Sequence, residues 1–288
     1  QAGGYDNNDI YAPEAWKIRS TSPDVIVAVI DGGIQSDHPD LINNIWVNEL
    51  EIPENNIDDD GNGYVDDING WNFAYNNNFP LPDPHGTHVA GIIGAEGNNS
   101  FGVAGVTWDV QLMSLDVFGN ESYASDEDIW EGMYYAVDNG AKVINMSLGS
   151  VFYGTYQEYV NEDFYTDLGY RNALDYAINN GVTVVIAAGN EELNLDNNWL
   201  SLPAVYSELY EGVISVASVA NTGDLSYYSN YGSLVTIAAP GGETYQDFAG
   251  GIYSTVPFDS YEFFQGTSMA SPVVAGAVAL MLGENPNL

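Results

Sequence analysis

Three side chains that lie far apart in this chain could together form a nucleophilic centre. Ser268 stands in the turn Gly-Thr-Ser-Met-Ala, just before a run of small apolar residues. We expect that run to form a helix, whose N-terminus favours negative charge next to the hydroxyl. A serine hydroxyl is a weak nucleophile unless a positioned base removes its proton. The alternative is that Ser268 only caps a buried helix, so its partners decide between the two interpretations.

Of the three histidines, His85 is the best candidate for that base. It stands at the start of a Gly- and Ala-rich apolar run that we expect to be helical near 85–95. His88 lies inside the same run, so we expect it to face a different environment and to form hydrogen bonds within the fold. His38 precedes a proline, and we expect it to be held in a turn.

A neutral histidine needs a carboxylate to hold it in one tautomer, and Asp31 is placed to supply it. Asp31 directly follows 25–30, an apolar and mostly β-branched run without polar alternation. Such a run is typical of a parallel strand buried on both faces, and open α/β sheets place their chemistry at the carboxyl ends of their strands. On its own Asp31 could be an ordinary turn residue. Its interpretation as the orienting carboxylate rests on the chain order Asp31, His85, Ser268.

Five short motifs, in this order along the chain, resemble those of the subtilisin-like serine proteases, or subtilases. They occupy residues 29–41, 85–91, 145–149, 187–190 and 266–272. The resemblance covers nearly the whole chain, and the order Asp, His, Ser differs from that of chymotrypsin-like proteases and α/β-hydrolases. It implies a serine endopeptidase that cleaves protein or peptide substrates through a covalent acyl-enzyme.

The resemblance also implies roles for residues around these three. Asn190 would donate a side-chain N–H to the oxyanion, together with the Ser268 backbone N–H. The alternative is an asparagine that serves only as a cap or turn residue. The substrate would pair as an added strand, with pockets for its side chains and an apolar or aromatic preference in the first pocket. One wall of this groove would consist of Ser147, Leu148 and Gly149. We place the opposing segment at Ser122, Tyr123 and Ala124.

Gly32 departs from the family pattern, in which a threonine or serine directly follows the catalytic aspartate. Without that hydroxyl the Asp31 carboxylate has one hydrogen-bond donor fewer and holds the imidazole less firmly. Reduced activity would result. Two alternatives therefore stand beside the active protease: a catalytically weak or silent subtilase scaffold, and a calcium-dependent binding module.

An acidic loop at 58–69 has the spacing of a calcium-binding loop. Its sequence begins Asp-Asp-Asp-Gly-Asn-Gly, like an EF-hand loop with Gly63 at the sharp turn. An EF-hand has a bidentate glutamate where this loop has Asn69, so one of the last two aspartates must take that role. A solvated acidic loop is the alternative, but carboxylates this close repel one another without a cation. The ligands we expect are Asp58, Asp60, Asn62, Tyr64, and Asp66 or Asp67.

A second calcium site is implied by the resemblance alone. Residues 97–103 resemble a calcium loop that interrupts the histidine-bearing helix of known family members. A simple Asn-Asn turn would explain this loop but not the presence of a partner carboxylate. An N-terminal ligand would come from Asp6 or Asp9. The other ligands would be the side chains of Asp40 and Asn99 and the backbone oxygens of Gly97, Phe101 and Val103.

The charge balance is extreme, with 4 Lys and Arg against 41 Asp and Glu and a formal net charge of −37. Nucleic-acid binding is disfavoured, because it needs basic residues to neutralise phosphates. A high-salt habitat, calcium loading and attraction of cationic substrates all fit this charge, and composition does not rank them. The chain has no cysteine and therefore no disulfide. We find no signal peptide and expect no run that could span a bilayer.

The 288 residues are enough for one large core, and no linker or repeat divides them, so we expect one catalytic domain over 1–288. We expect buried strands near 25–30, 110–117, 142–147, 182–188, 213–218 and 234–238. We expect helices near 85–95, 125–139, 168–180 and 268–283. This alternation predicts a three-layer α/β fold with a mainly parallel central sheet flanked by helices. The resemblance further implies a mature extracellular enzyme that folds with a propeptide and continues beyond Leu288.

Overall fold

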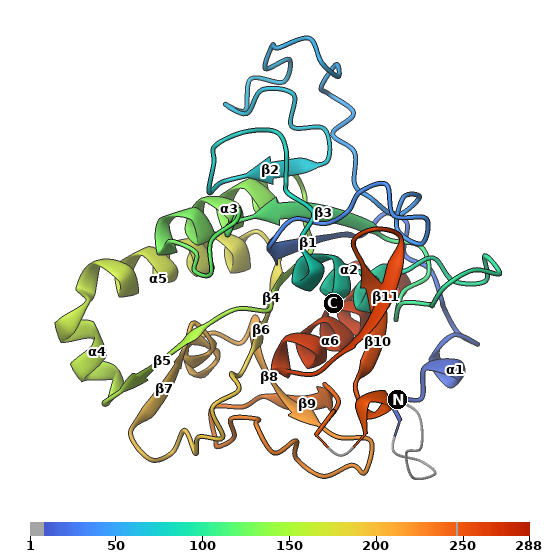
Figure 1. The fold of residues 1–288 in the computed structure, drawn as a ribbon. Coiled ribbons are helices and arrows are strands. Elements are labelled where there is room, and N and C mark those ends of the chain that lie inside the picture. The colour runs from blue at the N-terminus through green and yellow to red at the C-terminus, as the bar shows by residue number, and fades with distance from the viewer. Residues whose placement is uncertain (1–8, 246) are drawn as a thin grey trace.

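A central sheet of seven parallel strands organises the protein, whose computed structural model describes residues 9–245 and 247–288. The strand order is β2-β3-β1-β4-β6-β8-β9 (Figure 1). The strands are β1 (Ile26–Asp31), β2 (Gly70–Asn72), β3 (Gln111–Asp116), β4 (Val143–Met146), β6 (Thr183–Ala187), β8 (Val213–Val219) and β9 (Ile237–Pro240). The predicted parallel sheet is confirmed, with β1 near its centre.

Helices cover both faces of the sheet, which makes three layers (Figure 1). In β1, Val27 and Val29 belong to the core shared with α2 and α6, whereas Ala28 and Ile30 belong to the core shared with α3 and α5. Alternate side chains of a strand point to opposite faces, so an uninterrupted apolar strand serves both layers. The α-helices are α1 (Ala12–Ala15), α2 (Pro84–Gly94), α3 (Asp126–Asp138), α4 (Tyr156–Glu162), α5 (Phe164–Asn179) and α6 (Thr267–Glu284).

Two antiparallel pairs of strands lie outside the central sheet and were not predicted. The first pairs β5 (Ser150–Tyr153) with β7 (Trp199–Leu202), and the second pairs β10 (Ile252–Val256) with β11 (Ser260–Phe264). Two short 3₁₀ helices, η1 (Ala204–Glu208) and η2 (Phe248–Gly250), complete the described elements. The four strands of these two pairs have only four or five residues each, too few for a clear pattern of alternation.

Helix α6 corrects the expectation that no run could span a bilayer. It is an 18-residue helix that is apolar enough to cross a membrane by length and composition. However, 67% of this window is buried inside the protein, where α6 packs against α2 and the sheet. The core helix of a globular domain passes the same test, so the finding is weak support for a membrane span.

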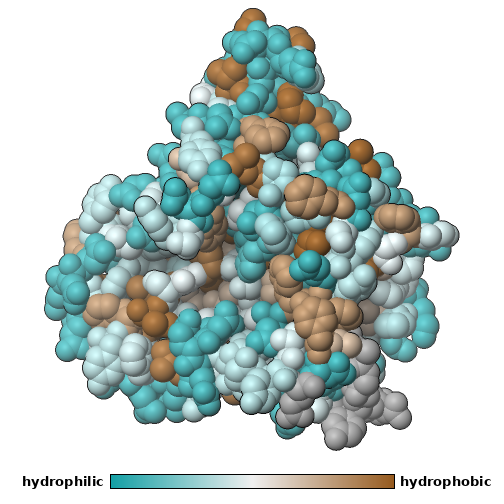
Figure 2. Space-filling model, viewed as in Figure 1, coloured by the Kyte–Doolittle hydropathy of each residue, from teal (hydrophilic) through white to brown (hydrophobic). Residues whose placement is uncertain are grey.

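The chain between Trp46 and β2 forms a projection at the top of Figure 1. It contains turns but no helix or strand over 47–69. Figure 2 shows its surface as mainly hydrophilic, with a few hydrophobic residues. The Tyr64 ring attaches it to the core, because it packs edge-on against Trp71 and Tyr135 at centroid distances of 5.0 and 4.9 Å.

Candidate active site and calcium loops

Asp31 and His85 meet where β1 ends and α2 begins. His85 lies in the first turn of α2, whose N-cap Asp83 accepts hydrogen bonds from the backbone N–H groups of His85 and Gly86 at 2.7 and 3.1 Å. His85 Nδ1 donates to Asp31 Oδ1 at 2.8 Å, and the same oxygen accepts from the Gly32 N–H at 2.8 Å. The carboxylate is buried while the imidazole is partly exposed. The imidazole is therefore held in the tautomer that leaves Nε2 free to act as a base.

The electrostatics of this pair favour a charged imidazole. Burial lowers the pKa of His85, but the charge of Asp31, its hydrogen bond and the charge of Asp83 raise it, so that this pKa lies above its ordinary value of 6.5. A base whose conjugate acid is stabilised by a fixed carboxylate can take a proton from a hydroxyl and return it later.

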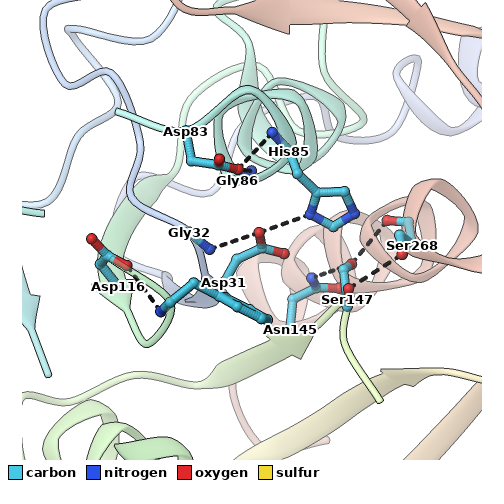
Figure 3. A network of polar contacts seen from close by, with 10 residues as sticks. Asp31, Gly32, Asp83, His85, Gly86, Asp116, Asn145, Ser147 and Ser268 are labelled. Carbon is cyan, nitrogen blue, oxygen red and sulfur yellow. Dashed lines mark hydrogen bonds and ion pairs between the residues drawn. The ribbon is translucent and has the colours of Figure 1, made fainter. Parts of the chain in front are cut away.

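Ser268 faces this imidazole from the first turn of α6 (Figure 3). The imidazole lies between Asp31 and Ser268 in the close view. The Ser268 hydroxyl donates to the Ser147 backbone carbonyl at 3.2 Å. Hydrogen bonds between a nucleophile and its base often tighten only when substrate is bound. A rotation of the Ser268 side chain would turn its hydroxyl toward His85.

Two N–H donors border an open space beside Ser268. Asn190 Oδ1 accepts from the backbone and the hydroxyl of Thr267 at 2.8 and 3.0 Å, which leaves the Asn190 Nδ2 hydrogens for another acceptor. The Ser268 N–H belongs to the first turn of α6 and has no intrahelical partner. A Cβ atom at Gly266 would lie 3.5 Å from Ser268 N and 3.8 Å from Asn190 Nδ2. The absence of a side chain at Gly266 thus keeps open a place for an oxyanion.

The predicted substrate segments line two adjoining cavities. A cavity of about 510 Å³ brings together Asp31, His85, Asn190 and Ser268. Its walls also include Ser147, Leu148, Gly149 and Ser122. A second cavity of about 610 Å³ shares Ser122, Leu148 and Gly149 with it, and is lined further by Tyr123 and Ala124. Figure 2 shows the molecule hollowed in this region. The segment 122–124 is not a strand in this structure.

The cleft is acidic. The first cavity is lined by Asp83, Glu121 and Glu191 beside the proposed catalytic residues, and none of its lining residues is a lysine or arginine. The lining of the second cavity likewise has no basic residue, and it contains Asp126, Glu162 and Asp163. Burial and the neighbouring charges of Glu127 and Asp163 raise the pKa of Asp126, although a hydrogen bond from Tyr170 lowers it. This distribution of charge favours the approach of basic peptides.

Comparisons with known proteins agree with this geometry. The model of the subtilase family matches residues 22–288. The chain belongs to the subtilase family. It is 34% identical to thermitase of Thermoactinomyces vulgaris over 97% of this chain and 82% of that protein. It is 37% identical to the major intracellular serine protease of Bacillus subtilis over 94% of this chain and 72% of that one.

Other relatives extend this result. A thermophilic serine proteinase of Bacillus sp. strain AK1 is 34% identical over 98% of this chain, which spans 58% of that protein's length. A solved protease structure from Pseudoalteromonas arctica has a TM-score of 0.73 and 30% identity, and covers 99% of this chain and 85% of its own. Family and relatives make this subtilase a serine endopeptidase.

One oxygen of the Asp31 carboxylate in this subtilase has no hydrogen-bond partner in the part of the chain that the structure describes, and the neighbouring Gly32 is sterically constrained. Asp31 Oδ2 is buried and has no hydrogen-bond partner among the described residues. A Cβ atom at Gly32 would lie 2.6 Å from Asp83 Cβ. Gly32 does not have a positive φ. The side chain of Asp83, rather than a backbone conformation restricted to glycine, therefore excludes a serine or threonine at this position.

The other two histidines are structural, as expected. His88 Nε2 lies 3.0 Å from the Ile252 carbonyl and 3.1 Å from the Glu262 carbonyl, and its ring stacks on Phe264. Burial lowers the pKa of His88 to about 4. His38 Nε2 lies 3.2 Å from the Ser260 carbonyl. Both rings are thus engaged with the β10–β11 hairpin.

The projection brings three carboxylates together, one of which the sequence analysis missed. Oxygens of Glu51, Asp58 and Asp60 lie within 4.8 Å of one another, and we call these three residues the acidic cluster. Glu51 is buried and accepts from the backbone N–H groups of Asp59 and Asp60 at 2.7 and 3.1 Å. Glu51 stands before the twelve-residue loop, so loop spacing offered no signal for it.

Two predicted ligands of this loop, Asp66 and Asp67, do not belong to the acidic cluster. Asp66 accepts from the backbone N–H groups of Asn55 and Asn56 at 3.1 and 2.9 Å. Asp67 accepts from Asn62 within the loop and from the Tyr135 hydroxyl, which connects the loop to α3. Burial raises the pKa of Asp67, although its hydrogen bonds lower it. Asn62 still contacts the acidic cluster through Asp60, and Tyr64 follows it in the chain.

The second loop meets its predicted partner, but with different chemistry. We call Asp40 together with 97–103 the Asp40 loop. Asp40 is buried and accepts from Asn99 Nδ2 at 2.8 Å, from the Val103 N–H at 2.7 Å and from the Tyr261 hydroxyl at 3.2 Å. The Asn99 amide oxygen accepts from the Phe101 N–H. Of the remaining predictions here, Gly97 packs on Trp108, Asp9 accepts from the Tyr11 N–H, and Asp6 lies outside the described residues.

Proposed function

We propose that this subtilase cleaves peptide bonds with Ser268 as nucleophile, His85 as general base and acid, and Asp31 orienting the imidazole. Ser268 attacks the scissile carbonyl while His85 takes its proton, and Asn190 with the Ser268 N–H holds the oxyanion. His85 then protonates the leaving amine, and water attacks the acyl-enzyme with His85 again as base. The observation that carries this proposal is the 2.8 Å bond from His85 Nδ1 to Asp31 in the cleft that Ser268 lines.

The substrate is a protein or peptide bound in extended form. The segments 147–149 and 122–124 form walls of the two adjoining cavities and are open to solvent on the cleft side. Backbone pairing along 147–149 would supply affinity, while the two cavities would receive side chains of the substrate. This arrangement supports the endopeptidase function over the alternative of a binding module, because nucleophile, base and oxyanion donors converge in the same groove.

We propose that calcium binds the acidic cluster and stabilises the projection. Carboxylate and carbonyl oxygens are the ligands that Ca²⁺ prefers, and Glu51, Asp58 and Asp60 provide three carboxylates at close range. Asn62 and the Tyr64 backbone oxygen would complete the set. When bound, calcium would neutralise the mutual repulsion of the carboxylates. The Asp40 loop fits an ion less well, because the described residues gather no group of three carboxylates around Asp40 as they do in the acidic cluster.

We also propose that the enzyme acts outside the cell and folds with a propeptide, as the family resemblance implies. The proposed calcium dependence supports an extracellular location, where calcium is abundant. Among its relatives is a protease named as intracellular, so the family alone does not decide the compartment. Proteolytic activity found in the cell lysate rather than in the culture medium of the source would contradict this location. Equal refolding yields with and without the precursor segment would contradict the propeptide.

A fluorophosphonate probe tests the nucleophile directly, since only an activated serine reacts with it. The protein should be labelled and should cleave casein, and Ser268→Ala should lose both labelling and turnover while keeping its melting temperature. Ser215→Ala changes a buried serine that lines neither cavity, and this variant should be labelled normally. An unlabelled parent protein would favour the silent scaffold instead, and turnover by Ser268→Ala would remove Ser268 from the mechanism.

The pH profile tests the base. His85 acts only when unprotonated, so kcat/KM should be lost as pH falls through its raised pKa, above 6.5. Asp31→Asn removes the main influences that raise this pKa, so the acid limb should move to lower pH. We expect this variant to lose about 10⁴-fold in kcat, as in the comparable substitution of another serine protease. An acid limb at the same pH in both proteins would show that a different group titrates.

A further inference from the structure

The backbone carbonyl of Ser268 lacks the helical hydrogen bond that its position requires. In an α-helix this carbonyl accepts from the N–H four residues later. In α6 that residue is Pro272, which has no N–H and whose ring crowds the carbonyl. The hydroxyl of Ser147 donates to the carbonyl instead, at 2.8 Å (Figure 3). A side chain at the end of β4 thus replaces a missing backbone donor.

The direction of the Ser147 hydroxyl is set by a chain of buried polar groups. Ser271 Oγ donates to Asn145 Oδ1 at 2.8 Å, and Asn145 Nδ2 donates to Ser147 Oγ at 3.0 Å. Asn145 and Ser271 are fully buried, and Ser147 is nearly so. Because Asn145 occupies a lone pair of the Ser147 hydroxyl, the single hydroxyl hydrogen is directed to the Ser268 carbonyl.

Ser147 and Ser268 are joined by two hydrogen bonds of opposite direction. Besides the bond to its carbonyl, Ser268 donates its own hydroxyl to the Ser147 carbonyl at 3.2 Å. The first turn of α6 is therefore locked to the segment 147–149, which we propose pairs with substrate. A displacement of about 1 Å between a nucleophile and its substrate can cost about 100-fold in rate.

We propose that the Ser147 side chain is a positioning residue, which compensates for Pro272 and holds Ser268 at the correct distance from the bound peptide. This inference rests on the proposed role of Ser268 as the nucleophile. The Ser147 hydroxyl acts through the Ser268 backbone and contacts no reacting atom. Its loss should consequently reduce the rate of the chemical step and leave peptide binding nearly unchanged.

A double-mutant cycle tests this compensation. Ser147→Ala should lower kcat by about 10- to 100-fold and leave KM within about twofold. Pro272→Ala restores an N–H that can donate to the Ser268 carbonyl. Because the helix then supplies the missing donor, kcat of Ser147→Ala/Pro272→Ala should return to within about threefold of Pro272→Ala alone. Rescue of this kind is not expected if Ser147 only stabilises the fold.

A matched control separates positioning from general stability. Ser215→Ala also removes a fully buried hydroxyl, one that donates to the Leu234 carbonyl at 2.7 Å, and Ser215 lines neither cavity. It should lower the melting temperature without changing kcat. Titration with the fluorophosphonate probe measures the concentration of active enzyme in each preparation, so that each kcat is calculated per active site.

Two results would overturn the inference. One is an unchanged kcat in Ser147→Ala, and the other is a double variant as slow as Ser147→Ala. Failure of the underlying function would be recognised separately, because Ser268→Ala would then retain turnover whatever the outcome of the cycle.

Discussion

The acidic cluster and the Asp40 loop differ in the number of carboxylates that the fold brings together. The cluster brings three carboxylates within 4.8 Å of one another, and each of them accepts hydrogen bonds from three neutral N–H groups. The Asp40 loop contains one buried carboxylate with three donors from the protein. One negative charge can be balanced by dipoles of the chain, whereas three at this distance repel one another strongly.

No ion pair among the described residues joins a basic side chain to the acidic cluster. Lys17, Arg19 and Arg171 form ion pairs with carboxylates elsewhere in the protein. With only 4 basic residues in the chain, a cation from solution is the available source of positive charge. Acidic spacing alone therefore does not identify a calcium site. The number of carboxylates that the fold brings together separates the two loops, because the carboxylates of both loops accept similar numbers of hydrogen bonds.

Removal of calcium should have the largest effect. Calcium at 100 times its Kd would stabilise the folded state by about 2.7 kcal/mol, which corresponds to a melting temperature about 5–10 °C higher. Chelator should remove this shift and speed self-digestion, measured on the Ser268→Ala variant and the active enzyme respectively. Sodium chloride at matched ionic strength should restore only part of the lost melting temperature, because charge screening lacks the directional coordination of a bound ion. Complete rescue by sodium chloride would mean that the cluster is only solvated acidic surface.

Neutralising the cluster should remove most of the calcium response. In Asp58→Asn/Asp60→Asn only Glu51 of the acidic cluster keeps its charge, and one carboxylate does not bind calcium tightly. Calcium should therefore raise the melting temperature of this variant by about a quarter of the parent shift or less. The control Glu49→Gln/Glu54→Gln removes the same charge from exposed positions of the projection and should keep the full response. Equal responses in the two double variants would show that calcium acts through overall charge.

The Asp40 loop should show the smallest effect, and one independent of calcium. Asp40→Asn places an amide N–H against N–H and O–H donors, which should cost about 1 kcal/mol, or 2–4 °C, with or without calcium. Melting curves of this variant in calcium and in chelator decide the matter. If the calcium shift itself is smaller than in the parent, the Asp40 loop binds an ion, as the family resemblance implied.

The central elements could be predicted because their patterns are local. The apolar runs of β1 and β6 and the Gly- and Ala-rich run of α6 have few alternatives to burial, and their observed bounds lie within a residue or two of the expected ones. The two antiparallel pairs outside the central sheet could not be predicted in this way. β5 pairs Ser150 with Leu202, so its existence depends on a contact with a segment about fifty residues later in the chain.

The candidate site divides along the same line. Asp31, His85, Asn190 and Ser268 could be chosen from sequence, because few residue types perform nucleophilic catalysis and their order and motifs are specific. Three other contacts could not be predicted from the sequence. They are Glu51 beside Asp58 and Asp60, the Asp83 side chain against Gly32, and the Ser147 hydroxyl bonded to the Ser268 carbonyl that Pro272 leaves without a helical donor. Residue type sets which chemistry a group can perform, and this is readable along the chain. Whether a carboxylate has enough donors or a carbonyl finds a hydroxyl depends on distances between segments far apart in sequence, which only folding establishes.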